Sequence, residues 1–203
     1  MQARFSILQV GKVLFKPKAV FVEIAEHCPS SAGVFFGFAL WLGLCPPVFA
    51  YIGTMVFGWR LGVEPLFLPA ATVLAISAAY FVLLLFGFLS TAFVARWMAA
   101  TYGADESLGR SLALITLVGA PLTVGSVVHL YPHAVINVLV LVPALIWSMY
   151  LLYRGLPIVL ATDPGRGMLM ASSLIAWLLV AWVTLLGITV VLWSRGIGPQ
   201  VFI

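Results

Sequence analysis

The longest uncharged stretch of the chain covers residues 111–153 and contains no Asp, Glu, Lys or Arg. A single helix of that length would measure about 65 Å, roughly twice the hydrocarbon thickness of a bilayer. A proline inside a helix removes a backbone hydrogen bond and disfavours helical backbone angles at the preceding residue, so it often marks the end of a helix. Because Pro132 lies near the middle of the stretch, the pattern predicts a membrane hairpin that turns at residues 129–133.

The remaining apolar runs, bounded by charged residues, predict three more membrane spans. The five predicted spans cover residues 32–58, 67–95, 109–130, 133–154 and 168–193. Adjacent Pro46 and Pro47 predict a kink or break in the first span, and Pro121 and Pro143 predict kinks in the hairpin.

Short polar signals mark the ends of the predicted spans. Ser107 is a plausible N-cap for the third span. Arg154, followed by Gly155 and Pro157, predicts the end of the fourth span. The sequence of residues 163–165, Asp-Pro-Gly, predicts a type II turn before the fifth.

Residues 1–30 form a basic N-terminal segment before the membrane domain of residues 31–195, and residues 196–203 form a short tail. Between Pro17 and Pro29, apolar residues recur at helical spacing, with Glu23 and Glu26 on the other side. This pattern predicts an interfacial amphipathic helix. The pattern before Pro17 shows no clean apolar face.

Composition fixes the class of protein. The chain has 203 residues, of which 64% are hydrophobic and only 8% are charged, whereas soluble domains carry about 25% charged residues. We therefore predict an all-α polytopic membrane protein with five transmembrane helices. The net charge of +4 accompanies no nucleic-acid motif, so we expect anionic lipid headgroups as partners and no nucleic acid.

The distribution of basic residues predicts the orientation. Eight of the ten Lys and Arg residues fall in the N-terminal segment and the second and fourth loops, and two fall on the other side. By the positive-inside rule, the N-terminus is cytoplasmic and the C-terminus is outside.

Polar and aromatic side chains in the second half provide candidate lipid or ligand contacts. Trp147, Tyr150 and Arg154 fall on one face of the fourth span, so Arg154 would lie over Tyr150. They form either a headgroup pocket or an aromatic belt at the interface, and we favour the belt. The other candidate contacts are Arg96, Arg110, Pro121 and Asn137. For Asn137, with Thr116, Thr123 and Ser126, we favour hydrogen bonds between helices or to the backbone over a substrate path.

Small residues four positions apart permit close approach of helices in a membrane. Gly33 and Gly37 have this spacing in the first span, and Ala75 and Ala79 have it in the second. They predict helix packing and a homo-oligomer.

The sequence contains little that could perform catalysis. Apart from Arg110 and Arg154 at their ends, the predicted spans contain no Asp, Glu, Lys or Arg, which argues against hydrolysis and ion-coupled transport. His129 and His133 are four apart and could share a metal, but Pro132 disturbs that geometry, so we favour turn residues. Neither Cys28 with His27 nor Cys45 belongs to a spaced ligand set. We expect no metal, no cofactor and no enzymatic activity.

Most of the chain, and its second half above all, also resembles the Yip-domain family, which is named for the Ypt-interacting proteins. The resemblance rests on residues 147–157 (Trp-Ser-Met-Tyr-Leu-Leu-Tyr-Arg-Gly-Leu-Pro), on residues 119–122 (Gly-Ala-Pro-Leu) and on the entry at residues 14–18 (Leu-Phe-Lys-Pro-Lys). It implies five spans, a cytoplasmic N-terminus and, for a bacterial member, the inner membrane.

The resemblance defines the fold better than the function. Eukaryotic members are linked to Rab GTPases, but their Asp-Leu-Tyr-Gly motif is absent here, so we expect no Rab-type partner. We favour a non-enzymatic protein that organises membrane or partner proteins through helix contacts. The alternative is a channel, transporter or lipid-moving protein with a site between kinked helices.

Overall fold

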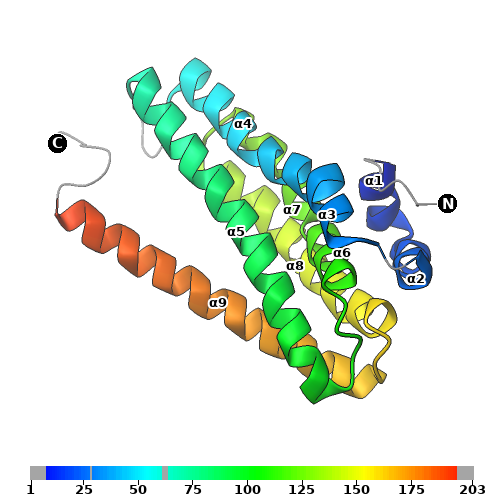
Figure 1. Ribbon diagram of the computed structural model, residues 1–203. Helices are drawn as coiled ribbons and strands as arrows, with labels where there is room; N and C mark the ends of the chain where they lie inside the picture. The colour runs from blue at the N-terminus through cyan, green and yellow to red at the C-terminus, as the bar shows by residue number, and fades with distance from the viewer. Residues whose placement is uncertain (1–7, 28, 61–63, 196–203) are drawn as a thin grey trace.

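Five helical stretches of the chain are long and apolar enough to cross a bilayer, as the sequence predicts (Figure 1). They are Ser31–Phe57, Ala70–Tyr102, Leu108–Leu130, Ala134–Val159 and Pro164–Val191. The structure is a computed structural model that describes residues 8–27, 29–60 and 64–195. The protein is an all-α polytopic membrane protein.

The first span combines α3 (Ser31–Val34), the π-helical segment η1 (Phe35–Ala39) and α4 (Leu40–Phe57). Ser30 caps its start by accepting a hydrogen bond from the Gly33 amide at 3.2 Å. Pro46 and Pro47 are buried inside α4, which continues past both. The span is therefore not broken at these prolines, and its irregular part is the π-helical segment.

The second span, α5 (Ala70–Tyr102), extends seven residues past the predicted end at residue 95. Arg96 and Trp97 are exposed on its surface, and a charged residue that faces outward does not stop a helix. The helix ends instead at Gly103, whose φ of 63° is a left-handed conformation that glycine adopts without strain.

The third span has three segments: α6 (Leu108–Val118), α7 (Ala120–Gly125) and the 3₁₀ helix η2 (Ser126–Leu130). Ser107 caps α6 by accepting a hydrogen bond from the Arg110 amide, which confirms the predicted cap. The break at Gly119 precedes Pro121, as a proline at the first turn of a new helix requires.

The fourth span, α8 (Ala134–Val159), corrects the predicted end at residue 154, because the helix continues for five residues and contains Pro143 and Pro157. Gly155 is not a stop signal. A Cβ at this position would collide with Phe21 and Leu114, so the glycine serves close packing within the helix.

The fifth span, α9 (Pro164–Ser194), begins four residues earlier than predicted. The Asp163 carboxylate accepts hydrogen bonds from the amides of Gly165 at 3.0 Å and Arg166 at 3.4 Å. Asp163 is thus positioned as an N-cap, with Pro164 at the first helical position. The predicted type II turn is wrong, because the helix already begins at Pro164. The prediction failed because the sequence Asp-Pro-Gly fits a helix start as well as a turn.

Two short N-terminal helices, α1 (Leu8–Phe15) and α2 (Pro17–His27), precede the membrane domain. The helix between Pro17 and Pro29 is confirmed, whereas α1 was not predicted. Phe21 and Ile24 of α2 are almost completely buried, and Phe21 lies against α8. The apolar face of α2 therefore packs on the helix bundle.

The loops gather at two ends of the bundle. At one end, which we call the basic end, the Asp105 amide donates to the Leu160 carbonyl at 2.7 Å and the Thr162 hydroxyl donates to the Tyr102 carbonyl at 2.8 Å. At the other, the hairpin-turn end, the Arg60 amide donates to the Pro132 carbonyl at 3.0 Å. Cys28 and the tail lie outside the described residues.

Candidate ligand cavity

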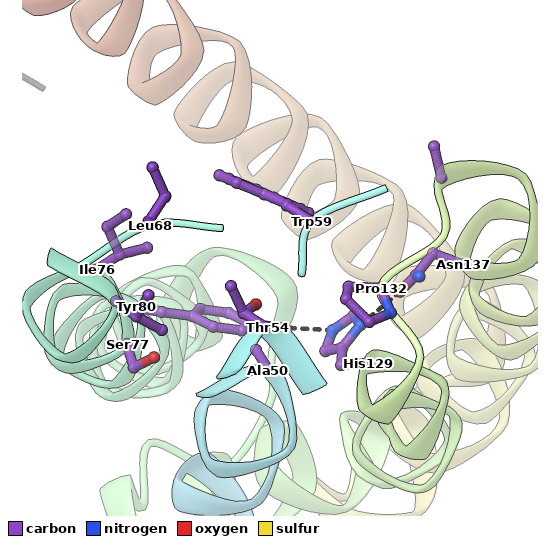
Figure 2. A pocket seen from close by; sticks show the side chains of 12 residues that line it. Ala50, Thr54, Trp59, Leu68, Ile76, Ser77, Tyr80, His129, Pro132 and Asn137 are labelled. Atoms are coloured by element: carbon purple, nitrogen blue, oxygen red, sulfur yellow. Dashed lines mark hydrogen bonds between the residues drawn. The ribbon is translucent and has the colours of Figure 1, made fainter. Parts of the chain in front are cut away.

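A cavity of about 410 Å³ lies at the hairpin-turn end, between α4, α5, η2 and the start of α8 (Figure 2). Its volume is in the range of pockets that hold small organic ligands. Among the described residues that line it, none is Asp, Glu, Lys or Arg. The lining residues are Ala50, Thr54, Trp59, Leu68, Val73, Ile76, Ser77, Tyr80, His129, Pro132, Ala134 and Asn137.

One wall of the cavity is polar and is built around His129. Its Nδ1 lies 2.5 Å from Asn137 Oδ1, and its Nε2 lies 3.5 Å from the Tyr80 hydroxyl (Figure 2). Asn137 Nδ2 donates to the His133 carbonyl at 2.9 Å. Since the amide nitrogen is used there, Oδ1 must accept from His129 Nδ1–H, which leaves Nε2 of the neutral ring as an acceptor facing Tyr80.

The close approach of α4 to η2 fixes the position of His129. Gly53 on α4 lies against the backbone of His129 and Leu130, and a Cβ at Gly53 would overlap both. Glycine is needed here because a side chain would not fit. Its backbone conformation is that of an ordinary helix, which any residue could adopt. The hairpin turn is therefore held against α4.

The loop after α4 reaches the hairpin turn beside the cavity. Trp59 and Leu66 pair their backbones, with N···O distances of 2.7 and 2.8 Å. The Arg60 guanidinium lies 5.2 Å from the centre of the Tyr131 ring, a cation–π arrangement. Tyr131 in turn stacks parallel to the His133 ring, with ring centres 6.3 Å apart. These contacts place Trp59 at the cavity.

Of the polar set Asn137, Thr116, Thr123 and Ser126, the structure brings only Asn137 to the cavity, where it meets His129 of the hairpin turn. The hydroxyls of Thr116, Thr123 and Ser126 donate to backbone carbonyls three or four residues earlier in the chain. This confirms the expectation of hydrogen bonds to the backbone for these three. Sequence reasoning missed Tyr80 and Trp59. Tyr80 offered one signal, a polar aromatic within an apolar span, whereas Trp59 follows the predicted end of the first span and offered none.

The aromatic–cationic group of α8 forms as predicted. The Arg154 guanidinium lies 5.8 Å from the Tyr150 ring centre, and its Nε donates to the Tyr150 hydroxyl at 3.4 Å. The Trp147 and Tyr150 ring centres are 5.1 Å apart. All three side chains are exposed, so contact with lipid stays a prediction that fits their position.

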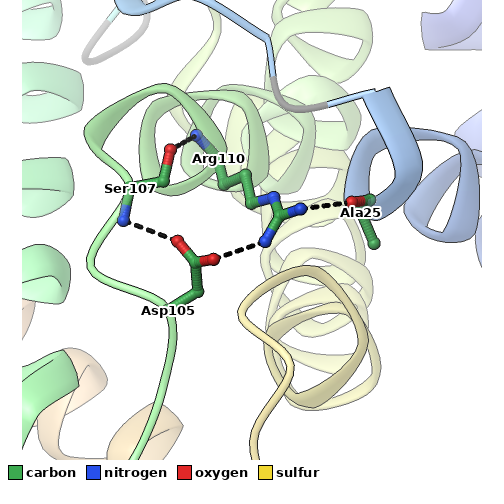
Figure 3. Close-up of polar contacts among 4 residues, drawn as sticks. All are labelled: Ala25, Asp105, Ser107 and Arg110. Atoms are coloured by element: carbon green, nitrogen blue, oxygen red, sulfur yellow. Dashed lines mark hydrogen bonds and ion pairs between the residues drawn. The ribbon is translucent and has the colours of Figure 1, made fainter.

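Arg110 has a different environment from the one expected for a headgroup contact (Figure 3). Its guanidinium bonds Asp105 Oδ2 and the Ala25 carbonyl, each at 2.5 Å, and its side chain is 14% exposed. Arg110 therefore joins the α5–α6 loop to the end of α2. Arg96 is exposed on α5 and Pro121 is buried.

The predicted small-residue pairs face outward. Gly33, Gly37, Ala75 and Ala79 are all exposed, and a Cβ at Gly37 would meet nothing within 4 Å. Close packing within the chain occurs at other glycines, including Gly53, Gly109, Gly119, Gly155 and Gly167. Packing through the predicted pairs would require a second molecule.

Metal ligation finds no support in the described residues, since no three His, Cys, Asp or Glu side chains among them form a group that could hold an ion. His133 belongs to the polar network only through its carbonyl. Its ring stacks on the ring of Tyr131, which lies in the same turn.

Taken together, the fold and the cavity define a five-span membrane protein with an uncharged cavity at one end of the bundle. A family model for the Yip1 domain matches residues 11–185, and the chain belongs to this family. It is 32% identical over 158 residues to the inner membrane protein YohC of Escherichia coli K12, covering 77% of this chain and 81% of that protein. YohC of Escherichia coli O6:H1 matches to the same extent. No solved structure matches the chain.

Proposed function

We propose that this is a non-enzymatic protein of the bacterial inner membrane that works by lateral helix contacts, and that α9 is the surface by which two copies associate. The observation that carries the proposal is the burial of α9, which is confined to its first half. Met170, Ala171 and Leu174 are buried, whereas the large side chains from Trp177 to Val191 are exposed.

The first half of α9 is fastened to the bundle by two side-chain hydrogen bonds. The Tyr102 and Tyr153 hydroxyls lie 3.1 and 2.9 Å from the hydroxyls of Ser173 and Ser172. Beyond them the helix leaves the bundle (Figure 1). The large side chains of its second half are exposed among the described residues.

The chemistry of the exposed half favours a second copy as its partner. Residues 177–191 include no charged side chain. The hydroxyls of Thr184 and Thr189 donate to the backbone of their own helix, so they are not available to hydrogen-bond a polar partner. A Cβ at Gly187 would meet nothing within 4 Å, which leaves room for close helix approach. A symmetric pair would bring identical uncharged faces together.

Disulfide cross-linking in native membrane vesicles tests this surface. In a chain with Cys28→Ser and Cys45→Ser, we expect Val183→Cys and Gly187→Cys to yield covalent dimers. Val138→Cys, which is equally exposed on α8 (60% against 63% for Val183), is the matched control. Equal cross-linking at all positions, together with single-step photobleaching of labelled molecules, would overturn the proposal.

The basic end faces the cytoplasm in this proposal. The support is the gathering of Arg110, the α8–α9 junction and the N-terminal α2 at one end, because basic residues concentrate on the cytoplasmic side. A membrane-impermeant thiol reagent applied to intact spheroplasts should label Thr101→Cys only after lysis, and labelling before lysis would reverse the orientation.

A second candidate function is the binding of a lipid-soluble molecule, and the cavity at the hairpin-turn end is the observation that favours it. Binding without flux in proteoliposomes would support a binding protein. Flux that Ser77→Leu abolishes would support a transporter that uses the cavity.

A further inference from the structure

We propose that the cavity binds a neutral amphiphile with a hydroxyl head and one apolar chain. This inference rests on the binding function proposed for the cavity and names the class of molecule that enters it. Three properties of the lining carry it: the absence of charge, the geometry of the polar wall and the apolar remainder.

The charge of the lining favours a neutral ligand. The twelve lining residues include no Asp, Glu, Lys or Arg, and the guanidinium of nearby Arg60 lies over the Tyr131 ring. A charged head in this cavity would lose its hydration without gaining an ionic partner among the lining residues, which is unfavourable. A phosphate or carboxylate headgroup therefore does not match the lining.

The polar wall favours a hydroxyl. The Tyr80 hydroxyl and His129 Nε2 are 3.5 Å apart, which is at the outer limit for a hydrogen bond. A ligand hydroxyl placed beside both would donate to Nε2 and accept from Tyr80, so that two shorter bonds replace one long bond. Asn137 Oδ1 lies 2.5 Å from Nδ1 of the same ring, which selects the neutral tautomer in which Nε2 is the acceptor.

The rest of the lining favours a single apolar chain. Beyond the polar wall, the cavity is lined by Val73 and Ile76 of α5 and by Ala50 of α4. Figure 2 shows Ile76 beside Leu68. A volume of about 410 Å³ accommodates one chain or a molecule of drug size. It does not enclose a phospholipid with two chains.

Photolabelling in lipid nanodiscs tests the ligand class. Three probes share one alkyl chain that bears a diazirine, and they end in an alcohol, a carboxylate or a methyl group. We expect the alcohol probe to label the lining residues of α4 and α5 at least fivefold more than the other two probes. The labelled positions are read by peptide mass spectrometry.

Substitutions separate the head from the chain. Tyr80→Phe should lower labelling by the alcohol probe about fivefold, the value of one hydrogen bond, and leave the methyl probe unchanged. Ser77→Leu, which places a larger side chain in the cavity, should block all three probes. Tyr150→Phe removes a hydroxyl at the aromatic–cationic group of α8 and serves as the matched control. If gel filtration shows that Ser77→Leu does not fold, Ala50→Leu replaces it.

The outcomes distinguish the two levels of the proposal. If the carboxylate or methyl probe labels the lining as strongly as the alcohol probe and Ser77→Leu still blocks labelling, the hydroxyl class is overturned and the binding function stands. If no probe labels the lining above lipid-facing Val138 on α8, both are overturned.

Discussion

The ring of Phe21 on α2 lies against the bare backbone of Gly155 on α8, where a Cβ atom would come within 2.7 Å of the ring. Phe21 is fully buried at this contact, and Leu114 of α6 lies on the same spot. The contact anchors an N-terminal helix to the membrane domain, so a glycine that marks the family resemblance also has a packing role.

Replacing this glycine should loosen α2. We expect Gly155→Ala to lower the free energy of unfolding by about 1–3 kcal/mol, because the new methyl group displaces Phe21 or Leu114 from a filled core. Gly87→Ala on α5 is the control, since its Cβ would meet nothing within 4 Å. Reversible unfolding in detergent measures both, and equal effects would show that the helical glycine, not the contact, determines stability.

The hydrogen bonds of Arg110 predict a second means of releasing α2. Arg110→Gln removes the ion pair with Asp105 and the bond to the Ala25 carbonyl. Loss of hydrogen bonds from a charged group costs about 1.5–3 kcal/mol. We expect limited proteolysis to cut residues 17–27 about tenfold faster in this variant.

Arg96→Gln is the control for that measurement, because Arg96 is an exposed arginine on α5. It should leave the cleavage rate of α2 unchanged. If both variants are cut at the wild-type rate, Phe21 and Ile24 hold α2 without help from Arg110.

Asn137 should contribute more to stability than the other polar side chains of the hairpin. Asn137→Leu leaves His129 Nδ1–H without its acceptor, and we expect a loss of about 1 kcal/mol, which is typical of hydrogen bonds between membrane helices. Thr123→Val removes only a bond to the helix's own backbone and should change stability by less than about 0.5 kcal/mol. Thermal unfolding followed by circular dichroism compares the two, and a larger loss for Thr123→Val would contradict this assignment.

The number and order of the spans could be predicted from the sequence. A long uncharged run in a bilayer must satisfy its backbone hydrogen bonds internally, and a membrane-spanning helix does this. The ends of the helices were harder to predict. Arg154, Gly155 and Pro157 match a stop signal, yet the helix passes through them because Gly155 provides space for Phe21. Whether a glycine ends a helix or allows packing depends on a neighbour that lies 134 positions away in the chain.

The cavity could be predicted only in part for the same reason. Asn137 was a candidate because an amide within an apolar span needs a partner. Tyr80 and His129 are 49 positions apart, and nothing in their local patterns indicates that they meet. Their contact depends on Gly53, which allows α4 to bring the hairpin turn close.

The start of α9 provides a last test, which concerns the cap that replaced the predicted turn. Asp163→Ala removes the acceptor for the Gly165 and Arg166 amides, and we expect a loss of about 1 kcal/mol in unfolding free energy. Asp163→Asn keeps a capping oxygen without the charge and should retain most of the stability, which thermal unfolding measures. If the asparagine variant is as unstable as the alanine variant, the negative charge at the helix N-terminus is responsible instead of the hydrogen bonds. A wild-type melting temperature for both variants would mean that packing of Met170 and Leu174 fixes the start of the helix without a cap.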